Sequence, residues 1–150
     1  MIIHELTAAQ CADLLERTTI GRLGCARDNQ PSIVPISFYF DRQEHCLYSF
    51  ATVGQKIEWM RENPKVCVEV DDITDKDHWT TVLVFGRYEE LTESSEDKAA
   101  RRRAQQLFES RPEWWFPAAG KTSSREPHAF VIYRIRIERI SGRRASRSRT

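Results

Sequence analysis

The sequence predicts a mainly β fold with peripheral helices, in which six antiparallel strands close into one small barrel. Most of the chain consists of short segments in which apolar and polar residues alternate, as they do in a strand with one buried face. Short polar turns join these segments, and such turns connect antiparallel neighbours. Gly21, Gly24 and Gly86 lie inside strand segments and mark bends, and a bent sheet removes its open edges by closing into a barrel.

The composition indicates one domain that can form its core without disulfide bonds. The chain has 150 residues, of which 40% are hydrophobic and 30% charged, and this is enough for a sizeable core. No apolar segment reaches the length of about 18 residues that a membrane helix needs, and the N-terminus has no signal-peptide pattern. The four cysteines, Cys11, Cys25, Cys46 and Cys67, include no C-x-x-C pair, which argues against a zinc knuckle. We therefore expect a cytoplasmic protein with no membrane partner, whose cysteines are reduced and buried.

The last ten residues differ in charge from the rest of the chain. They contain Arg143, Arg144, Arg147 and Arg149 and no acid, whereas the remainder is mildly acidic. We expect a single domain over residues 1–140 and a disordered basic tail over 141–150. The tail could contact nucleic acid, but so few phosphate contacts make a solvated end the favoured interpretation.

The N-terminal half is expected to hold two helices and three strands. Thr7 and Gln10 have the spacing of a capping box and predict the start of the first helix. A short helix follows Thr52 and ends at Asn63-Pro64, because the residue before a proline is disfavoured in a helix. The expected strands lie at 19–26, 32–40 and 45–50.

The C-terminal half is expected to add three strands, one helix and one long loop. The strands lie at 65–71, 79–91 and 128–140, the helix lies within 92–110, and the loop at 111–127 carries an aromatic cluster. In the strand at 65–71, three valines face the core while Glu69 and Asp71 face outward. In the last strand, Val131, Tyr133, Ile135 and Ile137 face inward against outward Arg134 and Arg136.

The familiar catalytic motifs are absent from the sequence. It contains no G-x-S-x-G, H-E-x-x-H, G-x-G-x-x-G or Walker A pattern, and its four histidines have no metal-ligand spacing. We therefore predict no metal site and name no catalytic acid, base or nucleophile.

Three places could bind a ligand. At the start of the second helix, free N–H groups, Lys56 and the hydroxyl of Thr52 would suit a phosphate, although Thr52 and Gln55 could instead form only a capping box. Pro35, inside an otherwise regular strand, marks either a sheet edge or a ligand against the backbone. Thr80 and Thr81 open the long strand at 79–91, although the favoured interpretation there is a core tryptophan, Trp79, beside β-forming threonines.

The order of these features resembles the pyridoxamine 5'-phosphate oxidase-like flavoproteins, the FMN-binding split barrels. The resemblance lies in the succession IVPISFYFD, LYSFATVGQK, a helix, ENPKVCVEVD and WTTVLVFGRYEEL, and again in VIYRIRIERISGR. It implies a six-stranded split barrel and a homodimer with FMN at the subunit interface.

The resemblance also implies roles for individual residues. Lys56 takes the phosphate-binding position with Thr52 and Gln55 nearby, and Thr80 and Thr81 lie where the central strand reaches the flavin. The segment along the flavin ring comprises Ile33, Val34, Pro35 and Ile36, and Trp114 and Trp115 could cover the flavin or a flat substrate, or serve only in packing. Two departures from the family pattern are Gln55, where many relatives have a second cation, and Phe50, where some have histidine.

The expected activity is that of an FMN-dependent oxidoreductase acting on a small molecule, with a nicotinamide as a possible electron donor. The chain lacks the C-terminal tryptophan that holds substrate in true pyridoxine phosphate oxidases, so we do not expect that reaction. The alternatives are a non-catalytic flavin or haem binding protein and a reductase that uses the deazaflavin F420.

Overall fold

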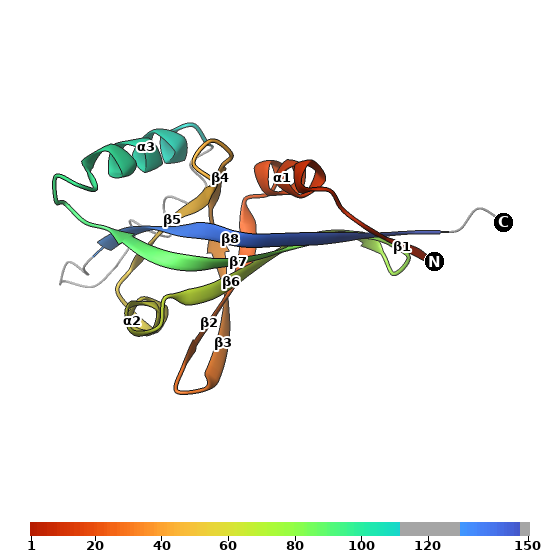
Figure 1. Ribbon diagram of the computed structural model, residues 1–150, viewed down its shortest axis with the longest axis horizontal. Coiled ribbons are helices and arrows are strands. Elements are labelled where there is room, and N and C mark those ends of the chain that lie inside the picture. Colours follow the sequence, from red (N-terminus) through yellow and green to blue (C-terminus); the bar gives the residue numbers. More distant parts are fainter. Residues whose placement is uncertain (112–129, 148–150) are drawn as a thin grey trace.

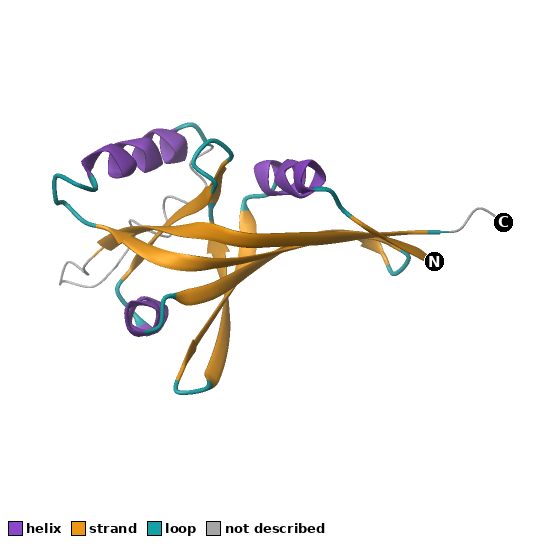
Figure 2. Cartoon of the chain, viewed as in Figure 1, coloured by secondary structure: helices purple, strands orange, loops and turns teal. Residues whose placement is uncertain are grey.

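The described residues form an antiparallel β structure with three helices. The computed structural model describes residues 1–111 and 130–147 (Figures 1 and 2). The strands are β1 (Ile2–Glu5), β2 (Ile20–Arg27), β3 (Gln30–Ser37), β4 (Tyr39–Asp41), β5 (Cys46–Thr52), β6 (Lys65–Asp75), β7 (His78–Leu91) and β8 (Phe130–Ser146). The helices are α1 (Ala8–Arg17), α2 (Gln55–Glu62) and α3 (Lys98–Glu109).

One sheet forms the whole barrel. Its strand order is β3-β2-β6-β7-β8-β5-β4, with β1 added against β8, and every pairing is antiparallel. The two terminal strands of this order, β3 and β4, are consecutive pieces of one chain segment broken at Phe38. The covalent chain therefore joins the two edges and closes the sheet. The predicted mainly β split-barrel class is confirmed.

The part of the chain that the structure describes forms eight strands rather than the expected six. The segment 32–40 was predicted as one strand, but it divides at Phe38, whose N–H donates to Thr19 O at 3.0 Å while its carbonyl accepts from Arg111 Nη1 at 2.5 Å. β1 was not predicted because its four residues are all exposed and show no alternation. It forms by pairing with the end of β8, from Ile2↔Ser146 to Glu5↔Arg143.

The predicted tail boundary at residue 140 is wrong for residues 141–146. These residues continue β8 between β7 and β1, and Figure 1 shows this arm extending beyond the barrel. Arg144 Nε donates to Thr80 Oγ1 at 3.3 Å, and Arg147 Nε lies 3.4 Å from Asp77 Oδ2. The arginines of this segment therefore sit on an ordered arm, because backbone pairing on both sides holds it. Residues 148–150 lie outside the described residues.

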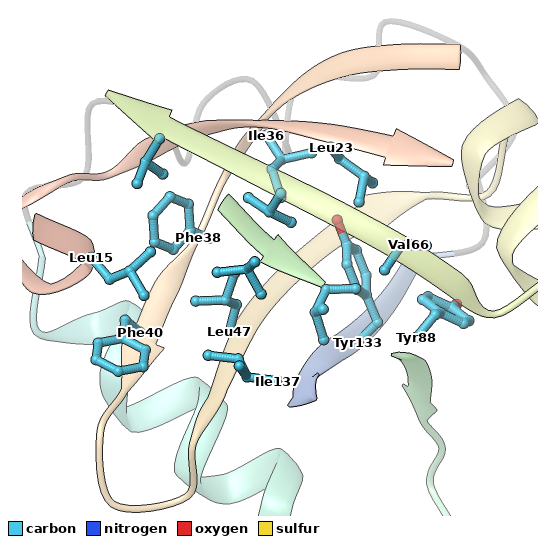
Figure 3. Packing of buried hydrophobic residues seen from close by; sticks show 14 of the residues in the cluster. Leu15, Leu23, Ile36, Phe38, Phe40, Leu47, Val66, Tyr88, Tyr133 and Ile137 are labelled. Carbon is cyan, nitrogen blue, oxygen red and sulfur yellow. The ribbon is translucent and has the colours of Figure 1, made fainter. Parts of the chain in front are cut away.

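The barrel interior holds the main core (Figure 3). Its side chains come from strands far apart in sequence, for example Leu23, Ile36, Leu47 and Tyr133, which point toward one another. α1 and α2 contribute the same core with their apolar sides: Cys11, Leu14 and Leu15 from α1 and Ile57 and Met60 from α2. The predicted capping box of α1 is present, with Gln10 N donating to Thr7 Oγ1 at 3.2 Å and Thr7 N to Gln10 Oε1 at 2.9 Å.

A bulge in β8 changes which side chains face the core. The register with β7 shifts between Phe85 and Gly86, so that Glu138 is the extra residue. Before the bulge, Tyr133, Ile135 and Ile137 are buried in the barrel, as predicted. α3 packs Ala104 and Phe108 against the outer side of β5 and β8, in a second cluster with Cys46, Tyr48, Leu91 and Ile132.

The rest of the outer surface of the sheet is covered by no described helix. We call this surface the open face; it is formed by alternate residues of β3, β2, β6, β7, β8 and β1, because directly paired residues project to the same side. Of the eight exposed large hydrophobic side chains within residues 1–111 and 130–147, it carries five: Ile3, Ile20, Ile33, Ile73 and Phe85. Ile33 is 76% exposed, a high value for an isoleucine in the middle of a strand.

Two further findings concern membrane-spanning helices and the state of the cysteines. Within the described ranges no helix is long and apolar enough to span a bilayer. All four cysteines are free; three are buried, and Cys67 is half-buried on the open face, so the prediction of buried thiols is wrong for Cys67.

Gly86 has a steric role that predicts a stability effect. A Cβ at this position would meet the backbone carbonyl oxygen of Arg136 and lie 2.8 Å from Ile135 Cγ2, at the register shift. Gly86→Ala should therefore lower the free energy of unfolding by about 1–3 kcal/mol, measured in urea. Gly54→Ala is the control, because nothing lies within 4 Å of its Cβ position. Equal stabilities for the two variants would contradict this assignment.

Candidate functional site

The barrel is split between β3 and β5. β3 pairs with β2, and β5 pairs with β8 and, through its first three residues, with β4. β3 and the second half of β5 therefore face each other without a ladder among the described residues. A single side chain bridges the closed end of this split: Ser49 Oγ donates to Ser37 O at 2.6 Å.

The hydrogen-bond alternation of the β2–β3 hairpin decides which groups of β3 face the split. The two-residue turn has Asp28 and Asn29 at positive φ, as a type I′ turn requires, so the flanking pair Arg27↔Gln30 exchanges hydrogen bonds. Counted from the turn, every second residue pair of the hairpin exchanges hydrogen bonds in the same way. The bond from Phe38 N to Thr19 O falls at one of these hydrogen-bonded positions. The residues in between, Pro31, Ile33, Pro35 and Ser37, direct their backbone groups away from β2.

Pro35 is accommodated for this reason, since its missing N–H would have pointed into the split rather than into the ladder. Pro35 lies on an edge strand of the sheet, as one of its two predicted interpretations has it, and this edge faces the split. Along it stand the carbonyls of Pro31, Ile33 and Pro35 and the N–H of Ile33. The side chains of Val34 and Ile36 point into the core instead, with Ile36 5% exposed.

The N-terminus of α2 lies at the end of β5, beyond Thr52 and Val53. Its N-cap is Gly54, which is extended at φ −157° and makes no side-chain capping bond. Thr52 belongs to β5, opposite Phe130, so the alternative capping box of Thr52 and Gln55 does not form. The first N–H groups of α2 consequently have no side-chain acceptor in the cap and keep their capacity to bind an anion.

Lys56 is the notable charge at this helix start. It is half-buried, and no ion pair joins it to a carboxylate within residues 1–111 and 130–147. Burial lowers the pKa of Lys56, an effect only partly opposed by the nearby Cys25 thiol. A cation that is partly desolvated at the positive end of a helix dipole is unfavourable in the absence of an anion. Gln55, beside it, is exposed.

α2 is fixed firmly enough to hold that lysine in place. Ile57 and Met60 are fully buried, and Arg61 Nε donates to Glu90 Oε1 at 2.9 Å. At the other end, Asn63 Nδ2 donates to Ala26 O on β2 at 3.0 Å. The helix therefore ties the start of β6 to the β2–β3 hairpin.

Two groups of predicted site residues lie elsewhere. Thr80 and Thr81 are on β7, which β2 and β6 separate from β3, and their hydroxyls bond to Arg144 and to Val70 O. One chain therefore does not bring them to the split, although Thr81 is on the open face. Trp114 and Trp115 lie outside the described residues.

Sequence reasoning missed the contribution of Ser37 and Ser49. A serine in the middle of the apolar stretch LYSF was the available signal, since a buried hydroxyl needs an acceptor. It also missed Cys25, whose thiol lies near Lys56; burial raises the pKa of Cys25. No group of three metal-binding side chains occurs in the part of the chain that the structure describes.

A closed antiparallel barrel, split at one edge and carrying a lysine at a bare helix start, defines the class of split barrels. The chain belongs to the pyridoxamine 5'-phosphate oxidase family, whose model matches residues 7–144. An uncharacterized protein of Rhizobium meliloti (strain 1021) is 33% identical over 148 residues, which are 97% of each chain.

Solved structures share the fold of this chain. A FAD-binding protein from Mesorhizobium loti is 39% identical with a TM-score of 0.78, and the match covers 97% of this chain and 100% of that one. A FAD binding protein from Mycobacterium smegmatis is 23% identical with a TM-score of 0.66, over 98% and 100% of the two chains, and shares the fold.

The unpaired charge of Lys56 predicts a stability gain on its removal. Because burial disfavours its charged form, Lys56→Met should raise the free energy of unfolding of the cofactor-free protein by about 0.5–1 kcal/mol near pH 7. The wild type should gain stability as pH rises through the lowered pKa toward the ordinary value of 10.5, since the unfolded state then binds more protons. Urea unfolding measures both effects. Lys65→Met, at an exposed lysine, should change little, and a destabilised Lys56→Met would contradict this account.

Proposed function

We propose that the protein binds a flavin nucleotide in the split between β3 and β5, with a phosphate at the start of α2. The observation that carries this proposal is the half-buried Lys56, which has no carboxylate partner among the described residues and stands at a helix start without a capping side chain. A phosphate would supply the missing anion and accept hydrogen bonds from the free N–H groups.

The residues beside the split suit the rest of a flavin. The edge of β3 offers carbonyl acceptors from Pro31, Ile33 and Pro35 and one N–H donor from Ile33, a pattern that can meet the donors and acceptors on the rim of a flavin ring. Thr52 ends the opposite strand next to the helix. The lysine and helix start suit the phosphate of FMN, which we predict, and equally a phosphate of FAD, which the Mesorhizobium loti protein is named for.

The activity that we propose is hydride or electron transfer to or from a small molecule. A bound flavin supplies that chemistry, and the chain binds it, orients it and limits its contact with water. Such a transfer needs no protein nucleophile, so the lack of a recognisable triad is compatible with it. A nicotinamide is the proposed electron donor. A non-catalytic flavin or haem carrier of the same fold, or an F420-dependent reductase, is the alternative.

We further propose that the protein is a homodimer through the open face. Five exposed large hydrophobic side chains on one continuous sheet surface form an apolar area of the kind that proteins bury against a partner. Because a two-fold interface uses the same surface twice, Thr81 of each chain would then meet the partner chain and could complete a site there.

The cofactor is tested on the purified protein. We expect a yellow protein whose visible spectrum is that of a flavin, with FMN released on denaturation and identified by mass; release of FAD, haem or F420 would replace FMN by that cofactor. Bleaching by NADH or NADPH would identify a redox enzyme, and its absence with every donor a carrier. Lys56→Met should weaken flavin binding about 10- to 100-fold, because a charge-assisted contact is worth roughly 1.5–3 kcal/mol. Lys98→Met, at an exposed lysine at the start of α3 and away from the open face, should bind normally; a colourless protein that takes up no added flavin would refute the proposal.

The dimer is tested by a charge on the open face. Ile33→Asp should sediment as a monomer while keeping its fold, because this side chain is 76% exposed in a single chain and its replacement opens no cavity. Ile2→Asp is the matched control: Ile2 is also exposed, at 43%, but projects to the other side of the sheet. Two variants with equal oligomeric states would place the interface elsewhere.

A further inference from the structure

We propose that association of two chains through the open face takes up protons at a carboxylate pair, Glu69 and Asp71, so that the dimer is tighter at lower pH. This inference rests on the proposed dimer and adds to it a regulation by pH.

The pair lies in the middle of the open face. Glu69 and Asp71 are two residues apart on β6 and project to the same side, like Cys67 before them and Ile73 after them. Around the pair, on neighbouring strands, lie the exposed Ile20, Ile33 and Phe85. A partner that covers these apolar side chains must therefore cover the carboxylates as well.

One guanidinium serves both carboxylates. Arg22 Nη1 lies 3.2 Å from Asp71 Oδ2 and bonds to it, but lies 3.8 Å from Glu69 Oε1. Glu69 Oε1 is itself buried without a hydrogen-bond partner among the described residues. One arginine against two carboxylates leaves the cluster with a net negative charge, and Glu69 is the poorly compensated member.

The other elements around the pair bring no nearer cation. On β7, the residues opposite are Leu83 and Thr81, and the Thr81 hydroxyl is directed to Val70 O at 3.4 Å. On β3, beyond Arg22, lies the uncharged Pro35. The other cations of the open face are Lys65, four residues before Glu69 on β6, Arg87 opposite it on β7, and Arg139 and Arg143 on β8 across β7. Arg139 lies over the ring of Phe85, 4.3 Å from its centroid, and Arg143 pairs in register with Glu5 of β1.

Protonation of Glu69 reduces the net negative charge of this cluster. Burial, reinforced by the neighbouring Asp71, already raises the pKa of Glu69 to about 7 in the single chain. Covering the face removes water from the carboxylate, and this desolvation disfavours the charged form further. Each chain that associates above pH 7 therefore binds a proton at Glu69, shared with Asp71.

The sign and size of the effect follow from linkage. Below the pKa in the free chain both states are protonated, so the dimer dissociation constant is flat with pH. Between that pKa and the higher value in the dimer, the dissociation constant rises with pH, by up to about 100-fold per unit for two protons per dimer. The dimer is thus favoured in acid and weakened in alkali.

The test compares the dissociation constant of the purified holoprotein at about pH 6 and about pH 8.5, by sedimentation at several concentrations and by exchange between fluorescently labelled chains. The wild type should dissociate at least about tenfold more readily at the higher pH. Glu69→Gln, which carries no charge, should remove most of this difference and stay dimeric at both values. Glu44→Gln is the control; it removes the same charge from an exposed residue in the β4–β5 turn, away from the open face.

The outcomes separate this inference from the proposed dimer. A wild-type dimer with a pH-independent dissociation constant, or a Glu69→Gln variant that keeps the wild-type dependence, overturns the proton uptake and leaves the dimer standing. A protein that is monomeric at every pH overturns the dimer and with it this inference.

Discussion

The architecture depends on the break at Phe38. β3 and β4 are the two edges of one sheet, and they can be brought together only because a single chain segment changes its pairing partner there. The backbone of Phe38 is held on both sides: its N–H donates to Thr19 O, and its carbonyl accepts from Arg111, whose guanidinium also lies 4.3 Å from the ring centroid of Tyr39. The closure, the interior core and the split all follow from this one change of direction.

The same break makes a site possible. If the segment had continued as one strand along β2, no unpaired strand edge would have faced the second half of β5. α2 would then have begun beside a continuous sheet. Instead, the strand leaves β2 at Thr19 and joins β5 at Tyr48. Between these points the edge of β3 faces β5, and among the described residues only the Ser49–Ser37 bond crosses the gap. The helix that carries Lys56 stands at the open end.

Periodicity predicted the elements that bury one face and missed those defined by their partners. The valines of β6 and the inward tyrosine and isoleucines of β8 were identified, because alternation marks them. β1 and residues 141–146 have no such pattern; β1 is a strand because it pairs with residues 143–146, and residues 141–146 form a strand because they lie between β1 and β7. The division at Phe38 was missed for a related reason, since the segment keeps its alternation across the break. At the site, sequence order located Lys56 and the β3 edge, whereas the distance of Thr80 and Thr81 from them depends on sheet order, which no local pattern reveals.

The two prolines of β3 also affect how readily chains could aggregate through this strand edge. An unpaired strand edge is a template on which a second chain can add a strand, and repeated addition leads to aggregation. Such addition needs donors from the edge at every second residue. Pro31 and Pro35 remove two of them, so the edge can accept hydrogen bonds but cannot complete a ladder. The split can therefore stay open in a folded, concentrated protein without being filled by a neighbour's backbone.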